Sequence, residues 1–385
     1  MVSSLNQQPI HTVYGGAHLF KSGTCSKLGT LAQKAFNDYA PDASSLSRIF
    51  GIAEAVAQTV HQRVAERIRR GPVVEDFRID FEDGFGYRPD EEEDSAADNA
   101  AREVTAAVQA GSLPGMFGIR VKSFHAEATR TRALRTLDRF LSRATLPENF
   151  VVTLPKITAP EQVAELVDVL EPYPEVHIEI MIETPGSIFM LPQLLKAAQG
   201  KCLAAHFGAY DYTASLGITA AHQDLDHPAC DFARSMMLAS LADTGVWLVD
   251  GATNLIPIPP AVPRAWKLHY DNIRNSLYNG FYQGWDLHPA QIPARLVAVY
   301  TFFLEGLAEA SARLRNFMQQ AAQATRVGAV FDDAATGRGL LNYFQRAVHC
   351  GAIPENDVPD LAGVTVEELS SSFDRILAAR RSVQS

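Results

Sequence analysis

The stretch Val176–Glu183, VHIEIMIE, decides the fold class, because it is apolar at most positions and rich in β-branched residues. This composition is typical of a parallel strand that is buried on both faces. The strand is expected to end at Glu183, where the sequence ETPG brings a proline that cannot donate to a sheet ladder. A helical segment at 188–198 and a second short apolar strand at 202–208 follow, and this strand leads into Asp211.

Each of these two strands is followed by a carboxylate. Parallel neighbouring strands place Glu183 and Asp211 at the same end of a sheet, where α/β folds build their sites. Two acidic side chains on adjacent strand ends suit a hard divalent cation such as Mg²⁺. The same two acids could instead cap helices or pair with arginines, and their spacing alone leaves these alternatives open.

The rest of the chain repeats the alternation of strand and helix. Further strands are expected from His11, Phe77, Met116, Phe150, Val246 and Phe281, which gives eight in all. This pattern predicts an α/β fold, a (β/α)₈ TIM barrel of about 250 residues or more. We expect the barrel domain at 1–291, with a helical insertion at about 44–70 after the first strand, and the last barrel helix plus a helical C-terminal extension at 292–385. A doubly wound open sheet fits less well, because no Gly-x-Gly-x-x-Gly follows the first strand.

Composition limits the class of protein. The chain has 385 residues, of which 47% are hydrophobic, and a net charge of −10. No apolar run approaches the roughly 20 residues of a membrane span, and the first residues lack the features of a signal peptide. We therefore expect a cytoplasmic protein with no membrane association. The negative charge argues against nucleic acid as a partner, and the four scattered cysteines form no zinc or redox motif.

Polar side chains recur where the predicted strands end. Unpaired charges are costly in buried strands, so these residues either form ion pairs or build a site. Arg120 lies between two apolar residues and is expected to point into the barrel mouth, where a guanidinium would hold a carboxylate or an enolate oxygen. A structural ion pair with Glu82 or Asp83 is the alternative. His288 is expected to cap a helix, and the role of His206 is left open. The remaining strand-end residues are Asp80, Lys122, Lys156, Asp250 and Asp286.

Six short motifs occur in a characteristic order: DFED (80–83), IRV (119–121), LPK (154–156), IET (182–184), GAYD (208–211) and GWDLHPAQ (284–291). Together they resemble the citrate lyase β-subunit, malyl-CoA lyase and HpcH/HpaI aldolase group of the phosphoenolpyruvate/pyruvate superfamily. The resemblance implies an Mg²⁺-dependent carbon–carbon lyase or aldolase. The reaction it implies is the reversible cleavage of a small 2-oxo or hydroxy acid, or its CoA thioester, through a metal-stabilised enolate.

The same resemblance implies roles for individual residues. Glu183 and Asp211 would ligate Mg²⁺, with Mn²⁺ as an alternative. Mg²⁺ and an arginine both act where negative charge develops, which agrees with this chemistry. The residues expected to be catalytic are Arg120, Glu82 and Asp83, and those expected to contact the substrate are Arg120, Lys156, Glu183 and Asp80.

The chain departs from this family in the first strand, at Lys122 and in the helical insertion at about 44–70. The CoA-using members begin with Arg-Ser-x-Leu-x-x-Pro-Gly, whereas residues 12–21 read TVYGGAHLFK, which argues against a CoA thioester substrate. Lys122 stands where the family has asparagine. Related barrels form trimers or hexamers, so we expect a homo-oligomer.

Two other functions compete with the lyase. A phosphoenolpyruvate-handling phosphotransferase would need a nucleotide or phosphohistidine site, and no glycine-rich phosphate loop appears. A non-catalytic metabolite-binding or assembly subunit is the second, and the joint presence of Glu183, Asp211 and Arg120 counts against it.

Overall fold

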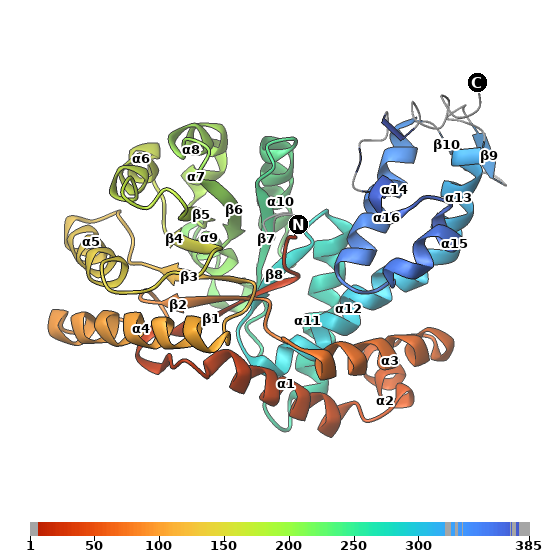
Figure 1. The fold of residues 1–385 in the computed structure, drawn as a ribbon, viewed down its shortest axis with the longest axis horizontal. Helices are drawn as coiled ribbons and strands as arrows, with labels where there is room; N and C mark the ends of the chain where they lie inside the picture. Colours follow the sequence, from red (N-terminus) through yellow and green to blue (C-terminus); the bar gives the residue numbers. More distant parts are fainter. Residues whose placement is uncertain are drawn as a thin grey trace. The chain divides into compact units, whose positions relative to one another are not determined.

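The computed structural model describes residues 7–319, 325–327, 330–332, 334–369, 371 and 375–376. Its centre is a closed barrel of eight parallel strands that neighbour one another in chain order (Figure 1). The (β/α)₈ fold expected from the sequence is therefore confirmed. The strands are β1 His11–Gly16, β2 Asp76–Asp80, β3 Met116–Arg120, β4 Phe150–Leu154, β5 His177–Ile182, β6 Cys202–Phe207, β7 Trp247–Ala252 and β8 Gln283–Asp286.

Helices follow the strands and lie outside them (Figure 1). Within the described part of the chain, no helix is both long enough and apolar enough to cross a membrane. The helices of the barrel are α1 Thr24–Tyr39, α4 Asp90–Ala110, α5 Glu127–Leu141, α6 Pro160–Val169, α7 Pro185–Phe189, α8 Leu191–Ala197, α9 Ala209–Ser215, α10 Pro228–Leu241 and α11 Val262–Tyr278.

Helix α4 shows how the sequence fixes such an element. Ala97, Ala101, Val104 and Ala107 are buried and recur at helical spacing, so one face of the helix is apolar. Four acidic residues occupy the first turn, where negative charge is favourable. Gly111, with a φ of 61°, ends the helix in the left-handed conformation that glycine adopts most easily.

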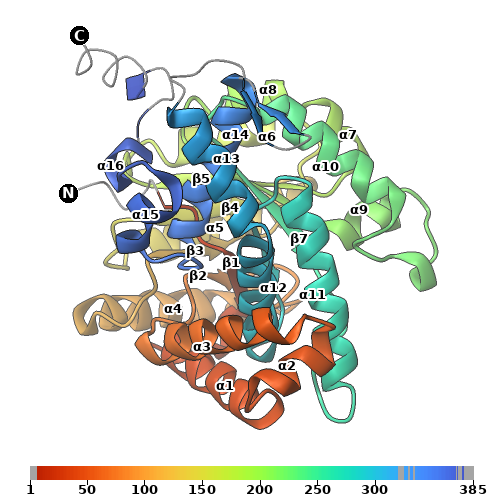
Figure 2. The same ribbon diagram turned by 90° about the vertical axis from the view of Figure 1, so that its right-hand side faces the viewer.

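The chain divides into two compact units, residues 1–39 with 68–294 and residues 40–67 with 295–385. The division at 292 expected from the sequence stays a prediction, since compactness alone does not establish independent folding. In the second unit α13 contacts α14 and α15 (Figure 2). The remaining helices are α2 Ala43–Phe50, α3 Glu54–Arg70, α12 Ile292–Glu305, α13 Leu307–Gln319, α14 Ala334–His349, α15 Val358–Ala362 and α16 Val366–Leu369.

The structure differs in three details from the helices expected from the sequence. The insertion at 44–70 is two helices, because Gly51 has a φ of 73° and its N–H donates to the Ser47 carbonyl at 2.9 Å, which ends α2. The segment at 188–198 is likewise divided between α7 and α8. The region after 292 is not wholly helical, because β9 (Thr325–Val327) and β10 (Val330–Asp332) form an antiparallel pair.

A buried polar network crosses the inside of the barrel around Glu179 of β5. Its carboxylate accepts hydrogen bonds from Arg78 Nη2 at 2.8 Å, Thr153 Oγ1 at 2.7 Å and Tyr14 Oη at 3.0 Å. His206 Nε2 lies 2.7 Å from the same carboxylate, so His206 is a buried core residue. Burial raises the pKa of Glu179, but Arg78 and His206 outweigh it and hold that pKa well below its usual value.

We expect Arg78→Met to lower the free energy of unfolding by about 3–5 kcal/mol, because it leaves the buried Glu179 carboxylate without its main counter-charge. Urea denaturation followed by circular dichroism measures this change. Lys267→Met is the control, since the Lys267–Asp271 pair is half exposed and should contribute about 0.5 kcal/mol or less. Equal effects of the two substitutions would contradict the importance of the internal network.

Candidate active site

The predicted site residues come together at the carboxyl ends of β2 to β6. Asp80 and Arg120 are the last residues of β2 and β3 and are paired in register. Glu183 follows β5 directly, and Asp211 lies in the first turn of α9 after β6. Lys156 follows β4 after one intervening proline. This is the face on which barrels of this type carry their active sites.

Asp80 holds Arg120 and the loop after β2 at the same time. Arg120 Nε donates to Asp80 Oδ1 at 2.8 Å and Nη2 donates to Oδ2 at 2.5 Å, which is a bidentate pair. The backbone N–H groups of Glu82 and Gly84 donate to the same two oxygens at 2.9 and 2.7 Å. The main partner of Arg120 is therefore Asp80. Arg120 Nη1 also forms the ion pairs with Glu82 and Asp83 that the sequence left as an alternative, at 3.4 and 3.8 Å.

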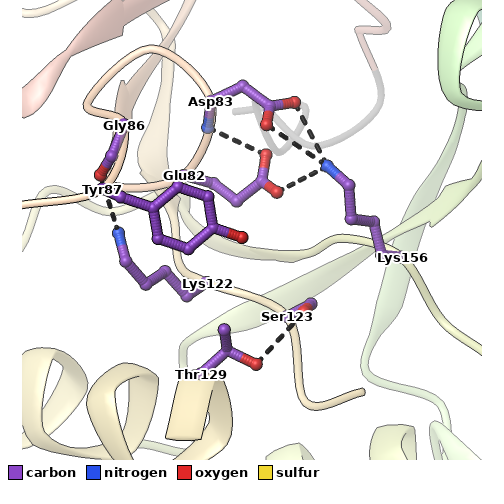
Figure 3. A pocket seen from close by; sticks show the side chains of 8 residues that line it. All are labelled: Glu82, Asp83, Gly86, Tyr87, Lys122, Ser123, Thr129 and Lys156. Carbon is purple, nitrogen blue, oxygen red and sulfur yellow. Dashed lines mark hydrogen bonds and ion pairs between the residues drawn. The ribbon is translucent and has the colours of Figure 1, made fainter. Parts of the chain in front are cut away.

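Lys156 links three acidic side chains. Its Nζ lies 2.5 Å from Glu82 Oε1 and 3.2 Å from Asp83 Oδ2 (Figure 3). The same Nζ lies 3.4 Å from Asp211 Oδ2. Burial lowers the pKa of Lys156, but the surrounding carboxylates, Glu183 and Glu82 first, raise it above its usual value. Its side chain is thus a charged ammonium group that holds the acids together.

The backbone of Lys156 also positions Glu183. Lys156 has a φ of 51°, which is unusual for a residue with a side chain, and its N–H donates to Glu183 Oε1 at 2.6 Å. On the other side, a Cβ at Gly208 would lie 2.3 Å from Glu183 Oε2, so only glycine leaves room for this carboxylate. Burial and the charge of Asp211, opposed by Lys156, raise the pKa of Glu183 to about 8.

Glu82 and Asp83 are adjacent carboxyls with opposite pKa shifts. Burial raises the pKa of Glu82, although Arg120 and Lys156 oppose that shift. For Asp83, burial acts in the same direction, but the hydrogen bond with Glu82 and the charges of Arg120 and Lys156 outweigh it and lower the pKa. Neighbouring groups whose pKa values are pushed apart are suited to act as acid and base.

Tyr14 and Trp285 contact Arg120 and were missed by the sequence analysis. Their rings lie 4.3 Å apart between centroids, and Arg120 Cζ lies 5.0 Å from the first centroid and 5.3 Å from the second. Such contacts stabilise a cation over an aromatic ring. The sequence places aromatic residues on strands β1 and β8, which could have pointed to these contacts, but such residues are equally typical of an apolar core.

Lys122 is anchored in the protein. Its Nζ donates to the carbonyl oxygens of Phe81 at 2.7 Å and Gly86 at 3.3 Å and lies 3.0 Å from Glu93 Oε2 on α4. Its side chain is buried, as is Glu93. Lys122 therefore attaches the loop after β2 to α4 at a second point.

Two other strand-end acids lie away from this group. Asp250 accepts from Ser276 at 2.5 Å and pairs with Arg234 at 3.3 Å, so it contacts the outer helices α10 and α11. Asp286 lies 2.8 Å from His269 Nε2, also on α11. His288 caps a short turn, as expected, because its Nδ1 accepts from the Ala290 N–H at 3.2 Å.

A cavity of about 260 Å³ adjoins the acidic group (Figure 3). Lys156, Glu82 and Asp83 line one part of it, Gly86 and Tyr87 line it from the loop after β2, and Lys122, Ser123 and Thr129 line it from the loop after β3 and from α5.

These features define a (β/α)₈ barrel with clustered acidic and basic side chains at the carboxyl ends of its strands. The chain belongs to the family described as "domain of unknown function (DUF6986)", whose profile matches residues 3–376. No curated protein matches the chain in sequence.

Solved structures with the same fold exist. A citrate lyase from Burkholderia xenovorans LB400 is 20% identical, with 91% of this chain and 96% of that chain covered and a TM-score of 0.65. The protein CitE from Mycobacterium tuberculosis, in complex with magnesium, acetoacetate and coenzyme A, is 18% identical, with 89% and 99% covered and a TM-score of 0.57. At these identities the likeness establishes a common fold, and at that level the resemblance drawn from the motifs is confirmed.

We expect Asp80→Asn to loosen the loop after β2, because an amide nitrogen cannot accept the hydrogen bonds that one carboxylate oxygen now accepts. Hydrogen–deuterium exchange of residues 81–86, followed by mass spectrometry, should become at least about ten-fold faster, the factor that corresponds to one lost hydrogen bond of about 1.4 kcal/mol.

Asp83→Asn is the matched control on the same loop. Its side chain is 59% exposed, and the loop amides of Glu82 and Gly84 do not depend on it. Unaltered exchange in Asp80→Asn would show that Asp80 does not order the loop.

Proposed function

We propose that this protein is an Mg²⁺-dependent carbon–carbon lyase or aldolase that acts on a small 2-oxo or hydroxy acid. The observation that carries the proposal is the convergence of Glu183 and Asp211 at adjacent strand ends, with Lys156 in contact with both and Arg120 nearby. The homo-oligomeric state and the cytoplasmic location expected from the sequence stay predictions.

The residues present fit a magnesium ion. Its protein ligands would be the two carboxylates of Glu183 and Asp211, at the ends of neighbouring strands. The described residues contain no group of three or more His, Cys, Asp or Glu that could hold a metal. Mg²⁺ suits such a site, because it commonly retains several waters and substrate oxygens. The raised pKa of Glu183 beside Asp211 also supports a metal ion at this position, since a divalent cation would relieve the repulsion between these carboxylates.

The other residues of the site would bind the substrate, stabilise developing negative charge and transfer protons. Asp80 uses Nε and Nη2 of Arg120, which leaves Nη1 directed toward Glu82 and Asp83 on the open side. Nη1 is therefore placed to donate to a carboxylate or to an oxygen that gains negative charge. A bound Mg²⁺ would supply Lewis-acid stabilisation of the same charge. We assign proton transfer to the Glu82–Asp83 pair. These acids lie beside Arg120, and their pKa values are shifted in opposite directions, upward for Glu82 and downward for Asp83.

The substrate class is proposed from two further observations. The fold neighbour CitE was solved with magnesium and acetoacetate, which supports a small oxo acid, and also with coenzyme A. In this chain, Tyr14 on β1 packs against Trp285 and Arg120, in the region where the CoA-using relatives carry Arg-Ser. We therefore propose a free acid, with acetyl-CoA tested as the alternative.

We expect Mg²⁺-dependent deuterium exchange into the methyl group of pyruvate in D₂O, measured by proton NMR, and at least about a hundred-fold slower exchange in Glu183→Gln and Asp211→Asn, because each loses a charged metal ligand. Binding of Mn²⁺, followed by electron paramagnetic resonance, should weaken in both variants. Glu171→Gln, at an exposed position after α6, is the control.

Three results would contradict parts of this proposal. Normal exchange in both variants would remove the metal assignment. Exchange with acetyl-CoA alone would replace the free acid by a thioester. Ligand and metal binding without any exchange would favour a non-catalytic subunit.

We expect Gly208→Ala to weaken Mn²⁺ binding by about ten-fold or more, because the new methyl group would displace the Glu183 carboxylate, and misplaced ligands cost affinity of this size. Gly186→Ala is a matched control three residues after Glu183, where a Cβ would meet only Met190 Cε at 3.7 Å. Similar affinity in the two variants would show that Glu183 does not bind the metal.

A further inference from the structure

Tyr14 joins the buried network inside the barrel to the Arg120 guanidinium. Its hydroxyl donates to Glu179 Oε1 at 3.0 Å and lies 3.2 Å from His206 Nδ1. Arg120 Cζ lies over the ring of the same side chain, 5.0 Å from the ring centroid. One side chain therefore contacts both the interior charges and the residue that is proposed to stabilise the enolate.

The hydroxyl of Tyr14 is directed into the interior of the barrel. Glu179 is ionised, because Arg78 and His206 hold its pKa well below the usual value, and it is therefore a strong acceptor. Burial raises the pKa of Tyr14, and the charge of Glu179 raises it further, so the phenol stays neutral. With its proton bound to Glu179, the phenol is not placed to transfer a proton at the mouth of the barrel. Its ring is the part that faces Arg120.

His206 holds both groups that meet at this hydroxyl. Its Nε2 lies 2.7 Å from Glu179 Oε2, while its Nδ1 lies beside Tyr14 Oη. The rings of Tyr14 and His206 also pack edge to face, with centroids 6.2 Å apart. His206 and Glu179 are each only 1% exposed. The Tyr14 side chain is thus held at its hydroxyl by two buried groups that have little freedom to move.

Arg120 needs a contact of this kind in addition to Asp80. Asp80 binds Nε and Nη2, which lie along one edge of the guanidinium. Two bonds along one edge leave the group free to tilt about the line through the two acceptor oxygens. Tyr14 and Trp285 limit this tilt, because Arg120 Cζ lies 5.0 and 5.3 Å from their ring centroids and the two rings pack 4.3 Å apart. The direction of Nη1, which the proposed reaction uses, therefore depends on these rings.

We propose that Tyr14 and His206 are positioning residues of the reaction centre. His206 and Glu179 hold the Tyr14 ring, and this ring holds the Arg120 guanidinium with Nη1 toward the open side of the barrel. The inference rests on the proposed lyase or aldolase function and adds to it two residues of the barrel interior that act through Arg120. It also gives a role to His206, which the sequence left open.

The experiment is a double-mutant cycle on the exchange of pyruvate protons. Exchange by the purified full chain with Mg²⁺ is followed by proton NMR in D₂O over a range of pyruvate concentrations, which separates kcat from KM. Tyr14→Phe keeps the ring and loses the hydroxyl. His206→Gln keeps an amide that can donate to Glu179 and loses the ring nitrogen beside Tyr14. We expect each substitution to lower kcat by about ten-fold, because Nη1 is no longer held in place. The double variant should fall no further, since both changes break the same connection.

Thr12→Val is the matched control. Thr12 Oγ1 donates to Asp76 Oδ2 at 2.8 Å in the same interior, so this substitution also removes a buried hydrogen bond but leaves Tyr14 and His206 unchanged. It should lower the free energy of unfolding, measured with urea, and leave kcat within about two-fold of the wild-type value. Mn²⁺ binding, followed by electron paramagnetic resonance, should be unaltered in all of these variants, because Glu183 and Asp211 keep their partners.

The outcomes distinguish the two proposals. If the wild-type protein exchanges pyruvate protons and Tyr14→Phe keeps its kcat, the inference fails and the proposed function stands. Losses that multiply to about a hundred-fold in the double variant, or an equal loss of kcat in Thr12→Val, would show a general structural effect and likewise overturn the inference. If His206→Gln does not fold, Tyr14→Phe against Thr12→Val decides. If the wild-type protein exchanges neither pyruvate nor acetyl-CoA protons, the proposed function fails and the inference fails with it.

Discussion

The Asp80 carboxylate is the interaction on which the arrangement of the site depends. Its two oxygens accept two N–H groups of Arg120 and the backbone N–H groups of Glu82 and Gly84. A buried carboxylate is tolerated only when it is paired and hydrogen-bonded, and here each bond also fixes a functional element. The end of β2, the end of β3 and the loop that carries Glu82 are consequently held in one geometry before any ligand binds, which is what electrostatic stabilisation of a developing charge requires.

From the inside of the barrel to its open end, charged side chains are less and less fully buried and paired with opposite charges. Around Glu179, all charged groups are buried and face opposite charges. The pair of Asp80 and Arg120 is equally buried but leaves one guanidinium nitrogen toward the open side. At the outermost step the side chains of Lys156 and Asp211 are 29% and 41% exposed. The innermost charges around Glu179 are thus fully paired within the protein, whereas Arg120, Lys156 and Asp211 lie nearer the open end of the barrel.

Lys122 and Lys156 have different roles because their surroundings differ. Lys122 and Lys156 both lie at the carboxyl ends of strands and both line the same cavity. Lys122 is buried against Glu93 and two carbonyls and attaches the loop after β2 to α4. The Lys156 ammonium group instead joins acids that follow β2 and β6. Lys122 is therefore a structural residue of the loop, whereas the Lys156 side chain is 29% exposed beside the acids that it joins.

The strands and the residues at their ends could be predicted from the sequence, because β-branched apolar runs such as VHIEIMIE are typical of parallel strands buried on both faces, and eight of them alternating with helices favour a barrel whose strand ends meet on one face. This order of strands predicts that Glu183, Asp211, Arg120 and Lys156 lie at the same end of the barrel. Only the tertiary structure decided that Arg120 pairs with Asp80, that Tyr14 and Trp285 support it, and that Gly208 makes room for Glu183. The physical reason is that these contacts join residues far apart in the chain, and their directions depend on how the strands pack and not on local periodicity.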